Sequence, residues 1–328
     1  MRKLFKNKKI ILAAGAILVV AAALLFWLLR DSPAIEPEPA QPTYSQLTGI
    51  EVAPEVAERP VLGIMIENSV PARPQTGLDA AGIVFESVTE GGITRYLALY
   101  QEDIPEVVGP VRSLRPHFLD WAMGFDVSIA HVGGSPEALQ RAEDRDAKSL
   151  SQFTFSDPYY RVSNRTSPHN MYTRTADLRS LQEEQNHDTS AFDEIPRKDD
   201  NPAENPAAAT IAVDYAGDSY KVEFRYSAEM NSYIRYLAGS PHIDAATDKP
   251  ITVKNVIIIK TPQQATGTNA IGNGEALVFT DGNVRTVRWE KDNFESRIKF
   301  VNDEGAEISL NRGDSWVSAL PSNRSVNY

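Results

Sequence analysis

Charged side chains gather around a short apolar run between Glu90 and Arg115, in the stretch EGGITRYLALYQEDIPEVVGPVRSLR. Glycines stand near both ends of this run. Polar groups this close to an apolar core need one another or a ligand as partners, because burial without a partner is costly. We therefore predict that the stretch forms one wall of a functional site.

Arginine dominates the basic residues of this region. Nine arginines stand between residues 60 and 175, where Lys148 is the single lysine. A planar guanidinium group can grip a carboxylate or phosphate with two hydrogen bonds, so the bias favours an anionic ligand. The residues predicted to bind this ligand are Arg73, Thr94, Arg95, Arg112, Ser113, Arg115, Ser135, Arg161, Arg165 and Asn170.

A structural role fits the same arginines. They could form an internal ionic network or simply lie on the surface. The carboxylates available for such a network are Glu67, Glu86, Glu90 and Asp120. Positions on the outer faces of predicted helices are expected for Arg141, Arg145 and Arg174. The sequence leaves both roles open for the arginines beside the glycine and proline turns.

Three residues are candidates for acid and base chemistry. Glu90 begins the apolar run, His131 ends a predicted strand before Gly133, and His169 lies in the segment RTSPHNMY. Imidazole titrates near neutral pH and is a common general base, although a single histidine is more often structural. We predict Glu90, His131 and His169 as catalytic residues if the protein is an enzyme.

Signatures of other site types are missing from the sequence. Neither the P-loop nor the dinucleotide-binding spacing of glycines occurs near the predicted site, and we predict no cofactor. No H-E-x-x-H spacing indicates a metal site, and we predict none. Ser113 and Ser135 lack the G-x-S-x-G context of a nucleophile, and capping of helices explains both.

The elements that would position these residues alternate between strand and helix. Apolar runs predict strands over residues 60–66, 82–88, 93–101 and 126–132. Helices are predicted over residues 113–123, from residue 135 onward, and over residues 175–187. Residues 59–190 therefore form an α/β domain, with a mixed sheet and flanking helices.

The pattern changes after a polar, proline-rich segment at residues 191–208, which we interpret as a linker. Residues 209–328 show short runs of alternating polarity, with a hairpin signal at Asp281-Gly282-Asn283. This half is predicted to be a mostly β domain.

The N-terminus predicts attachment to a membrane. Basic residues precede an uncharged run from Ile10 to Leu29, which has the length of a membrane span. Residues 1–30 are interpreted as a basic cytoplasmic tip and a transmembrane anchor, with a cleaved signal peptide as the alternative. Residues 31–58 then form a Pro/Glu-rich spacer. The protein is therefore expected in the cytoplasmic membrane, single-pass, with its C-terminal domains outside the cytoplasm.

Composition narrows the list of partners. The chain has no cysteine, so lipid attachment to cysteine and thiolate chemistry are excluded. Its net charge of −11 combines a basic first 30 residues with an acidic remainder. An acidic body argues against nucleic acid as a partner. An anionic wall polymer, a glycan or another envelope protein remains compatible with a local arginine site.

Five motifs of the first half carry a resemblance to a known family: ARPQTGL, EGGITRYLALYQ, GPVRSLRP, HVGGSP and SPHNMYT. The second half continues it through VKNVIIIK, GNGEALVFTDGNV and LNRGDSWVSAL. With these motifs the chain resembles the YerB-like family of predicted bacterial lipoproteins, whose two domains have no known function. The resemblance implies an extracytoplasmic, membrane-tethered protein, but it supplies no catalytic residues. The missing lipobox cysteine is a departure from many relatives.

Three functions remain compatible with these observations. The first is an envelope protein that binds an anionic wall polymer, glycan or partner through the arginines. The second is a hydrolase or transferase acting on a phosphoester or glycan with Glu and His as acid and base. The third is a structural scaffold whose arginines close internal salt bridges.

Overall fold

The computed structural model of the chain describes residues 2–30, 41–264 and 267–328. It divides into two compact units, Met1–Pro42 and Thr43–Tyr328. Helix α1 (Arg2–Arg30) contains the predicted span Ile10–Leu29. Within the described ranges, no helix combines the length and the hydropathy needed to cross a bilayer. The predicted transmembrane anchor is not supported by this finding.

A ten-stranded mixed sheet forms the centre of the unit Thr43–Tyr328, as far as the described residues show. In sheet order its strands are β24 (Lys299–Val301), β23 (Asn283–Lys291), β22 (Gly272–Thr280), β19 (Asn255–Thr261), β26 (Ser315–Pro321), β4 (Ile83–Val88), β5 (Thr94–Tyr100), β3 (Leu62–Glu67), β7 (Ser128–His131) and β8 (Ser149–Ser151). The pair of β26 and β4 is parallel, and it joins the two halves of the chain in one sheet.

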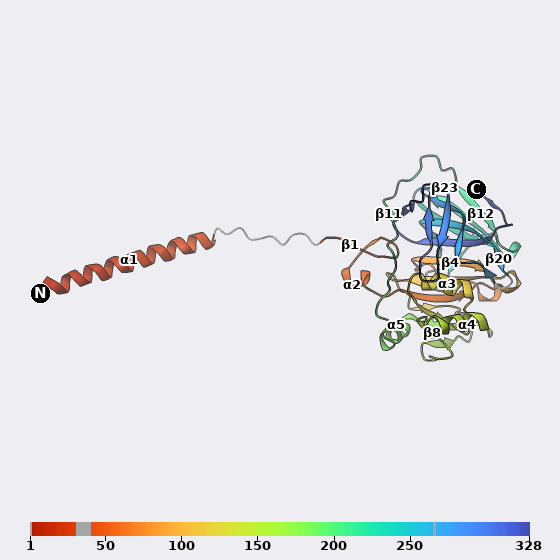
Figure 1. Cartoon of the computed structure of the whole chain (residues 1–328), viewed down its shortest axis with the longest axis horizontal. Coiled ribbons are helices and arrows are strands. Elements are labelled where there is room, and N and C mark those ends of the chain that lie inside the picture. The colour runs from red at the N-terminus through yellow and green to blue at the C-terminus, as the bar shows by residue number, and fades with distance from the viewer. Residues whose placement is uncertain (1, 31–40, 265–266) are drawn as a thin grey trace. The chain divides into compact units, whose positions relative to one another are not determined.

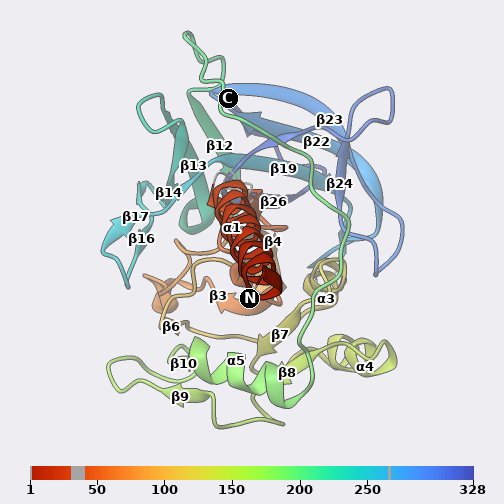
Figure 2. The same cartoon turned by 90° about the vertical axis from the view of Figure 1, so that its left-hand side faces the viewer.

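Two smaller sheets accompany the large one. The first holds β15 (Ser240–Pro241), β14 (Ser232–Leu237), β13 (Lys221–Ser227), β12 (Thr210–Asp214) and β27 (Val326–Asn327), with β18 (Thr252–Val253) on β14. The second holds β6 (Val107–Val108), β10 (Met171–Arg174) and β9 (Tyr159–Arg161). Figures 1 and 2 both show β12 and β23 at one end of the unit and α4, α5 and β8 at the other.

The remaining elements are short. Two-residue strands pair as β1 (Thr43–Tyr44) with β2 (Glu51–Val52), β11 (Arg197–Lys198) with β25 (Leu310–Asn311), β16 (Ile243–Asp244) with β17 (Lys249–Pro250), and β20 (Gln263–Gln264) with β21 (Gly267–Thr268). The helices are α2 (Pro54–Ala57), α3 (Pro116–Met123), α4 (Pro136–Asp144) and α5 (Thr175–Glu184), with 3-10 turns η1 (Val70–Ala72), η2 (Glu90–Gly92) and η3 (Asp218–Tyr220).

Both faces of the large sheet are covered, which explains why its central strands are apolar without alternation. On one face, Met65, Leu97 and Phe85 pack with residues of α3 such as Trp121. On the other face, side chains such as Tyr96 pack against the sheet that contains β12 to β14. Successive strand residues alternate between these two faces, which decides where each polar side chain at the strand ends lies.

Most predicted elements are confirmed. The mixed sheet with flanking helices and the mostly β second half agree with the expectation. The hairpin signal is confirmed as well, because Thr280 of β22 pairs with Asn283 of β23. Asp281 and Gly282 form its turn with positive φ angles of 58° and 76°, the backbone conformation that Asp-Gly turns adopt.

Two predicted connectors are ordered parts of the fold. The spacer predicted over residues 31–58 is wrong from Thr43 onward, because Leu47 is fully buried and Ser45 hydrogen-bonds to Gln101 at 3.0 Å. Residues 31–40 lie outside the described residues. The linker predicted over residues 191–208 contains Ile195, which is buried in the core, and β11, which pairs with β25.

Candidate functional site

Charged side chains gather at the ends of two neighbouring central strands, where β3 ends and β5 begins. Glu67 and Arg95 stand directly opposite each other in the antiparallel register of β3 and β5. Residues opposed in this way project from the same face, here the face covered by α3. Arg112 joins them because its backbone N–H donates to the carbonyl of Met65 at 2.8 Å. A strand register therefore builds the charged cluster that the sequence suggested.

Glu67 is the central carboxylate of the cluster and is only 3% exposed. Its Oε1 accepts hydrogen bonds from Ser69 Oγ at 2.7 Å and from His169 Nδ1 at 2.8 Å. Arg112 Nε lies 3.5 Å from the same oxygen. The other oxygen, Oε2, is buried and has no hydrogen-bond partner in the described part of the chain. Three groups thus converge on one side of a buried carboxylate.

Glu90 and Arg115 form a bidentate ion pair in the same cluster. Arg115 Nε and Nη2 donate to the two oxygens of Glu90 at 2.5 and 2.9 Å. Burial alone would raise the pKa of Glu90, but the hydrogen bond and charge of Arg115, with the charge of Arg95, lower it overall. Glu90 is therefore held as a carboxylate, and this geometry suits a fixed counter-ion better than a general acid.

Arg95 is buried with few partners, at 6% exposure. Its Nη1 donates to the carbonyl of Ser113 at 2.8 Å, and its buried Nε has no partner among the described residues. No carboxylate of the described ranges lies within the 4.0 Å that defines an ion pair with it. Burial, strengthened by the positive charge of Arg115, lowers the pKa of Arg95 to about 9. The charge of Arg95 is poorly compensated.

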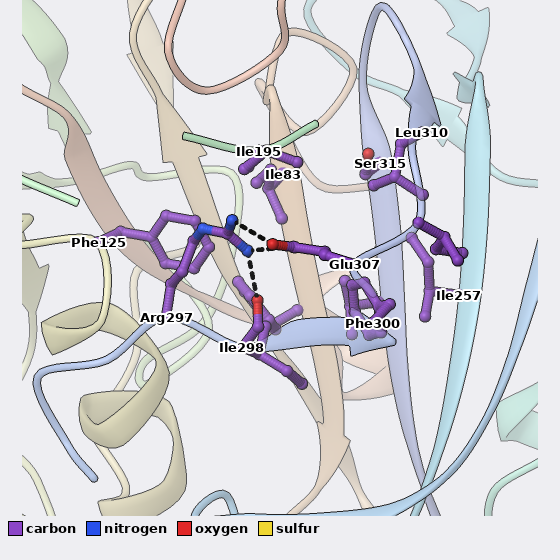
Figure 3. Close-up of a pocket in the computed structure, with 13 residues that line it drawn as sticks. Ile83, Phe125, Ile195, Ile257, Arg297, Ile298, Phe300, Glu307, Leu310 and Ser315 are labelled. Atoms are coloured by element: carbon purple, nitrogen blue, oxygen red, sulfur yellow. Dashed lines mark hydrogen bonds and ion pairs between the residues drawn. The ribbon is translucent and has the colours of Figure 1, made fainter. Parts of the chain in front are cut away.

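Arg297 is a buried arginine that has a full set of partners. Its guanidinium group lies against an apolar cavity lined by residues such as Phe125 and Ile257 (Figure 3). Nη1 and Nη2 grip Glu307 at 2.5 and 2.8 Å, and Nε donates to the carbonyl of Asp193 at 2.8 Å. With further bonds to backbone carbonyls, every nitrogen of Arg297 has a partner. Arg95, with one hydrogen bond and no ion pair among the described residues, differs from Arg297.

Arg112 supplies unused donors next to Arg95. The Arg112 side chain is 27% exposed, and within residues 41–264 and 267–328 its terminal nitrogens have no hydrogen-bond partner. Helix α3 has Arg115 as its N-cap, with no side chain capping its first amides. The predicted capping role of Ser113 is therefore wrong. Free guanidinium nitrogens favour anions.

His117 adds a neutral imidazole under the arginines. It is 2% exposed, and its Nε2 has no hydrogen-bond partner among the residues described. Burial, together with the charges of Arg95 and Arg115, lowers the pKa of His117 to about 3. This side chain consequently stays uncharged at neutral pH and adds no positive charge to the cluster.

The loop that carries His169 is held by three residues predicted to bind ligand. Arg165 donates to the carbonyls of Pro71 and Pro74 at 3.0 and 2.7 Å. Asn170 Nδ2 bonds to carbonyls within the loop, and its Oδ1 accepts from Arg161 at 2.7 Å. Arg161, Arg165 and Asn170 therefore shape the loop around His169.

Arg73 ties the site to the second half of the chain. Its Nε donates to Asn68 Oδ1 at 3.0 Å, and its Nη1 donates to the carbonyl of Ser219 at 2.8 Å. The guanidinium carbon also lies 4.9 Å from the ring centre of Tyr220. These contacts occupy Arg73 as a structural link next to the cluster.

Thr94 lies on the opposite face of the sheet from Arg95, because neighbouring strand residues alternate. There its Oγ1 donates to Glu86 Oε1 at 2.9 Å. Glu86 pairs with Arg235 at 2.8 Å, with both side chains fully buried, and accepts from Trp316 Nε1 at 3.0 Å. The structure therefore places Thr94 in an internal ion-pair network and not with the arginine cluster.

Two further predicted residues lie outside the cluster. His131 is fully buried, with Nδ1 on the carbonyl of Gly133 at 2.8 Å and Nε2 on Ser149 Oγ at 2.9 Å. Burial lowers the pKa of His131, and both ring nitrogens are occupied. Ser135 caps α4, because its side chain accepts from the N–H of Ala138 at 3.2 Å. The structure thus gives each of these two residues a structural role.

Three arginines expected on the outer faces of helices, Arg141, Arg145 and Arg174, form ion pairs with nearby carboxylates. Arg141 and Arg145 pair with Asp120, and Arg174 pairs with Asp177 at 3.8 Å. Arg141 and Arg145 thus pair with Asp120, one of the carboxylates considered from sequence, whereas Arg174 forms an exposed surface pair, and none of these pairs includes Arg95.

Glu67 and Ser69 are site residues that the predicted site omitted. Glu67 was considered only as a salt-bridge partner, although a carboxylate at the end of an apolar strand was a usable signal. Within the described residues, no group of three or more His, Asp or Glu side chains is arranged to hold a metal ion.

Comparison with known proteins gives consistent matches. Family models described as "Protein of unknown function (DUF3048)" match as the N-terminal domain over residues 47–189 and as the C-terminal domain over residues 211–317. The chain is 31% identical over 321 residues to "Putative lipoprotein YerB" of Bacillus subtilis (strain 168), covering 92% of this chain and 94% of that protein. The crystal structure of YerB from Bacillus subtilis matches with a TM-score of 0.78 and 29% identity, over 87% of this chain and 100% of that one. These matches confirm the resemblance noted from the sequence motifs, and the chain belongs to the DUF3048 family of YerB-like proteins.

Proposed function

We propose that this protein is a membrane-attached, extracytoplasmic protein of the bacterial envelope that binds an anionic ligand through Arg95 and Arg112. The observation that carries the proposal is the burial of Arg95 without a carboxylate within ion-pair distance among the described residues. The ligand class is a phosphate- or carboxylate-bearing wall polymer or glycan, or an acidic segment of an envelope protein.

Physical chemistry favours a ligand at this place. An arginine removed from water needs compensation by hydrogen bonds and opposite charge, and Arg95 has one hydrogen bond. Three arginines face two carboxylates in the cluster, which leaves one positive charge. An anion between Arg95 and Arg112 would supply both the charge and acceptors for the free N–H groups.

The relatives and the N-terminal sequence support this location. A relative is named as a lipoprotein, yet this chain has no cysteine to carry a lipid. We place the attachment in the apolar run Ile10–Leu29, with the basic residues before it on the cytoplasmic side. Extraction of bacterial membranes with alkaline carbonate tests this: the protein should stay in the pellet, and release into the supernatant would contradict a spanning anchor.

Isothermal titration of the purified full chain tests the binding function. The titrants are polyglycerol phosphate, polygalacturonate and an uncharged glycan of similar length. We expect one of the two anionic polymers to bind and the uncharged glycan not to bind. Arg95→Met and Arg112→Ala should each weaken binding at least tenfold, because each removes a charged guanidinium group.

The matched control is Arg288→Ala, which removes an exposed arginine of β23 that pairs with Glu290. This variant should bind like the wild type. Absence of binding by the wild type, or equal weakening by Arg288→Ala, would contradict a specific site at Arg95 and Arg112.

A hydrolase or transferase acting on a phosphoester or glycan is the second candidate function. The observation in its favour is the contact between His169 and Glu67 beside Arg112, with the His169 side chain 25% exposed. The scaffold alternative is supported by the Arg115 pair with Glu90. It leaves the burial of Arg95 unexplained.

A further inference from the structure

Glu67 and His169 form a carboxylate and imidazole pair with a fixed orientation. His169 Nδ1 lies 2.8 Å from Glu67 Oε1, and a carboxylate oxygen can only accept. Nδ1 therefore carries the proton, and the lone pair of the neutral ring lies on Nε2. No described residue is hydrogen-bonded to Nε2, and the side chain is 25% exposed. His169 Nε2 is therefore a base whose lone pair has no partner among the described residues.

Several contacts fix this pair in place. Glu67 is 3% exposed at the end of β3, and Ser69 Oγ donates to the same Oε1 at 2.7 Å. The backbone N–H of His169 donates to the carbonyl of Thr166 at 2.9 Å. Asn170 donates to the carbonyl of Arg165, and the Arg165 side chain donates to the carbonyl of Pro74, which holds the rest of the loop in place. Such support is what a preorganised general base requires.

The open imidazole lies next to the anion donors. Arg112 Nε is 3.5 Å from the same Glu67 oxygen that receives His169 Nδ1. Both side chains therefore flank one atom, and an anion on the free terminal nitrogens of Arg112 would lie beside the imidazole ring. The anion donor and the imidazole thus share Glu67 Oε1 as a common neighbour.

We propose that His169 is the general base of a phosphodiester hydrolase, with Glu67 as its positioning residue and Arg112 and Arg95 holding the phosphate. This inference rests on the proposed anion-binding function. In the reaction, His169 Nε2 takes a proton from water while the water oxygen forms a bond to phosphorus. The bond from phosphorus to the leaving oxygen breaks, and the imidazolium returns its proton to that oxygen. The products are a phosphomonoester and an alcohol.

The charge of the cluster selects the diester class. One positive charge remains uncompensated at the site, and a phosphodiester carries one negative charge at neutral pH. A phosphomonoester carries about −1.5 to −2 at pH 7 and would leave an excess of negative charge. A neutral glycan would leave the charge of Arg95 as it is. Electrostatic balance therefore points to a diester, which a wall polymer linked by phosphates also contains.

The test measures turnover and binding on the full chain. Bis(4-nitrophenyl) phosphate and a short glycerol phosphodiester oligomer are the substrates, and dimethyl phosphate is the unreactive binding probe. We expect His169→Gln to lower kcat by about 10²- to 10⁴-fold, the usual contribution of a general base, with little change in KM. Arg112→Ala should mainly raise KM. His187→Gln, at a half-buried histidine whose Nδ1 contacts Ser128 Oγ away from the cluster, is the matched control and should keep full turnover.

A spectroscopic readout separates the positioning role of Glu67 from a merely structural one. Nitrogen-15 chemical shifts of the His169 ring should show a proton on Nδ1 in the wild type. In Glu67→Gln the tautomer should shift towards Nε2–H while thermal unfolding still shows a cooperative fold. The opposite tautomer in the wild type would overturn the assignment without any substrate.

The outcomes distinguish this inference from the proposed function. Turnover lost in His169→Gln and kept in His187→Gln supports the hydrolase. Binding of dimethyl phosphate without turnover of either substrate overturns the hydrolase and leaves the anion-binding function standing. Absence of both binding and turnover overturns the hydrolase and the phosphate as ligand, and the anion-binding function falls with it if neither anionic polymer binds in the titration. Undiminished turnover in His169→Gln overturns the role of this residue.

Discussion

The substitution Arg95→Met gives the sharpest test of the uncompensated charge. Methionine keeps an unbranched apolar stem in the same volume and removes the guanidinium group. For a normal buried ion pair this change would destabilise the fold. For Arg95 we expect the opposite, because the native structure disfavours its charged form.

The magnitude follows from the pKa. The lowering of the Arg95 pKa to about 9 corresponds to about 5 kcal/mol of cost for the charged form in the native state. Because the native pKa is lowered, the native state holds the proton less tightly, and this cost is fully present at neutral pH. The substitution also removes the donor to the carbonyl of Ser113, which costs about 1–3 kcal/mol if the carbonyl stays buried. The net expectation is a gain in stability of about 2–4 kcal/mol.

Urea unfolding at pH 7 of the full chain, in chloride buffer without polyanions, measures this free energy. The midpoint should rise with an unchanged m-value, since the unfolded surface is the same. Arg297→Met is the matched control, because it removes a buried arginine whose nitrogens all have partners. That variant should lose about 3–5 kcal/mol. A loss in Arg95→Met as large as in Arg297→Met would refute the reasoning and favour the scaffold.

Three further predictions concern stability and use the same unfolding assay. Arg235→Met should cost about 3–5 kcal/mol, because it leaves the fully buried carboxylate of Glu86 without its cation; a loss below 1 kcal/mol would contradict this. Burial raises the pKa of Asp314 from 3.8 to about 7, so the native state binds this proton more tightly than the unfolded state and stability should fall as pH rises between these values; Asp314→Asn should flatten that fall, and an unchanged slope would count against it. Ser135→Ala should cost about 1 kcal/mol through loss of the α4 cap, whereas Ser113→Ala, at an uncapped helix, should stay within about 0.5 kcal/mol; equal losses would contradict the assignment of the caps.

Local sequence patterns predicted much of the fold near the site. The strands ending at Glu67 and beginning at Thr94 were visible as apolar runs. The helix that ends at Met123 followed from the helical spacing of its apolar residues. The arginine bias pointed to the correct region, because Arg95, Arg112 and Arg115 do lie together. These features depend on residues close in sequence or on one strand, where periodicity carries the information.

The rest depended on pairings distant in sequence. The grouping of Thr94 with Arg95 failed because it ignored the alternation of strand faces. The importance of Glu67 emerged only from the register of β3 with β5 and from a contact with His169, 102 residues away. The buried partner of Glu86 is Arg235, from the other half of the chain, and no local pattern predicts that contact. Burial of Ile195 in a polar segment was hidden for the same reason.

The place of β26 in the large sheet also affects the order in which the molecule can be completed. This strand, Ser315–Pro321, lies between β4 and β19, so β4 has no neighbour on that side until nearly the whole chain has been synthesised. Long-range parallel pairing is slow, and an open strand edge is prone to aggregation. The half of the chain that carries Arg95 therefore keeps one strand edge open until the last strand of the large sheet arrives, and we expect folding to be slow and sensitive to aggregation during that interval.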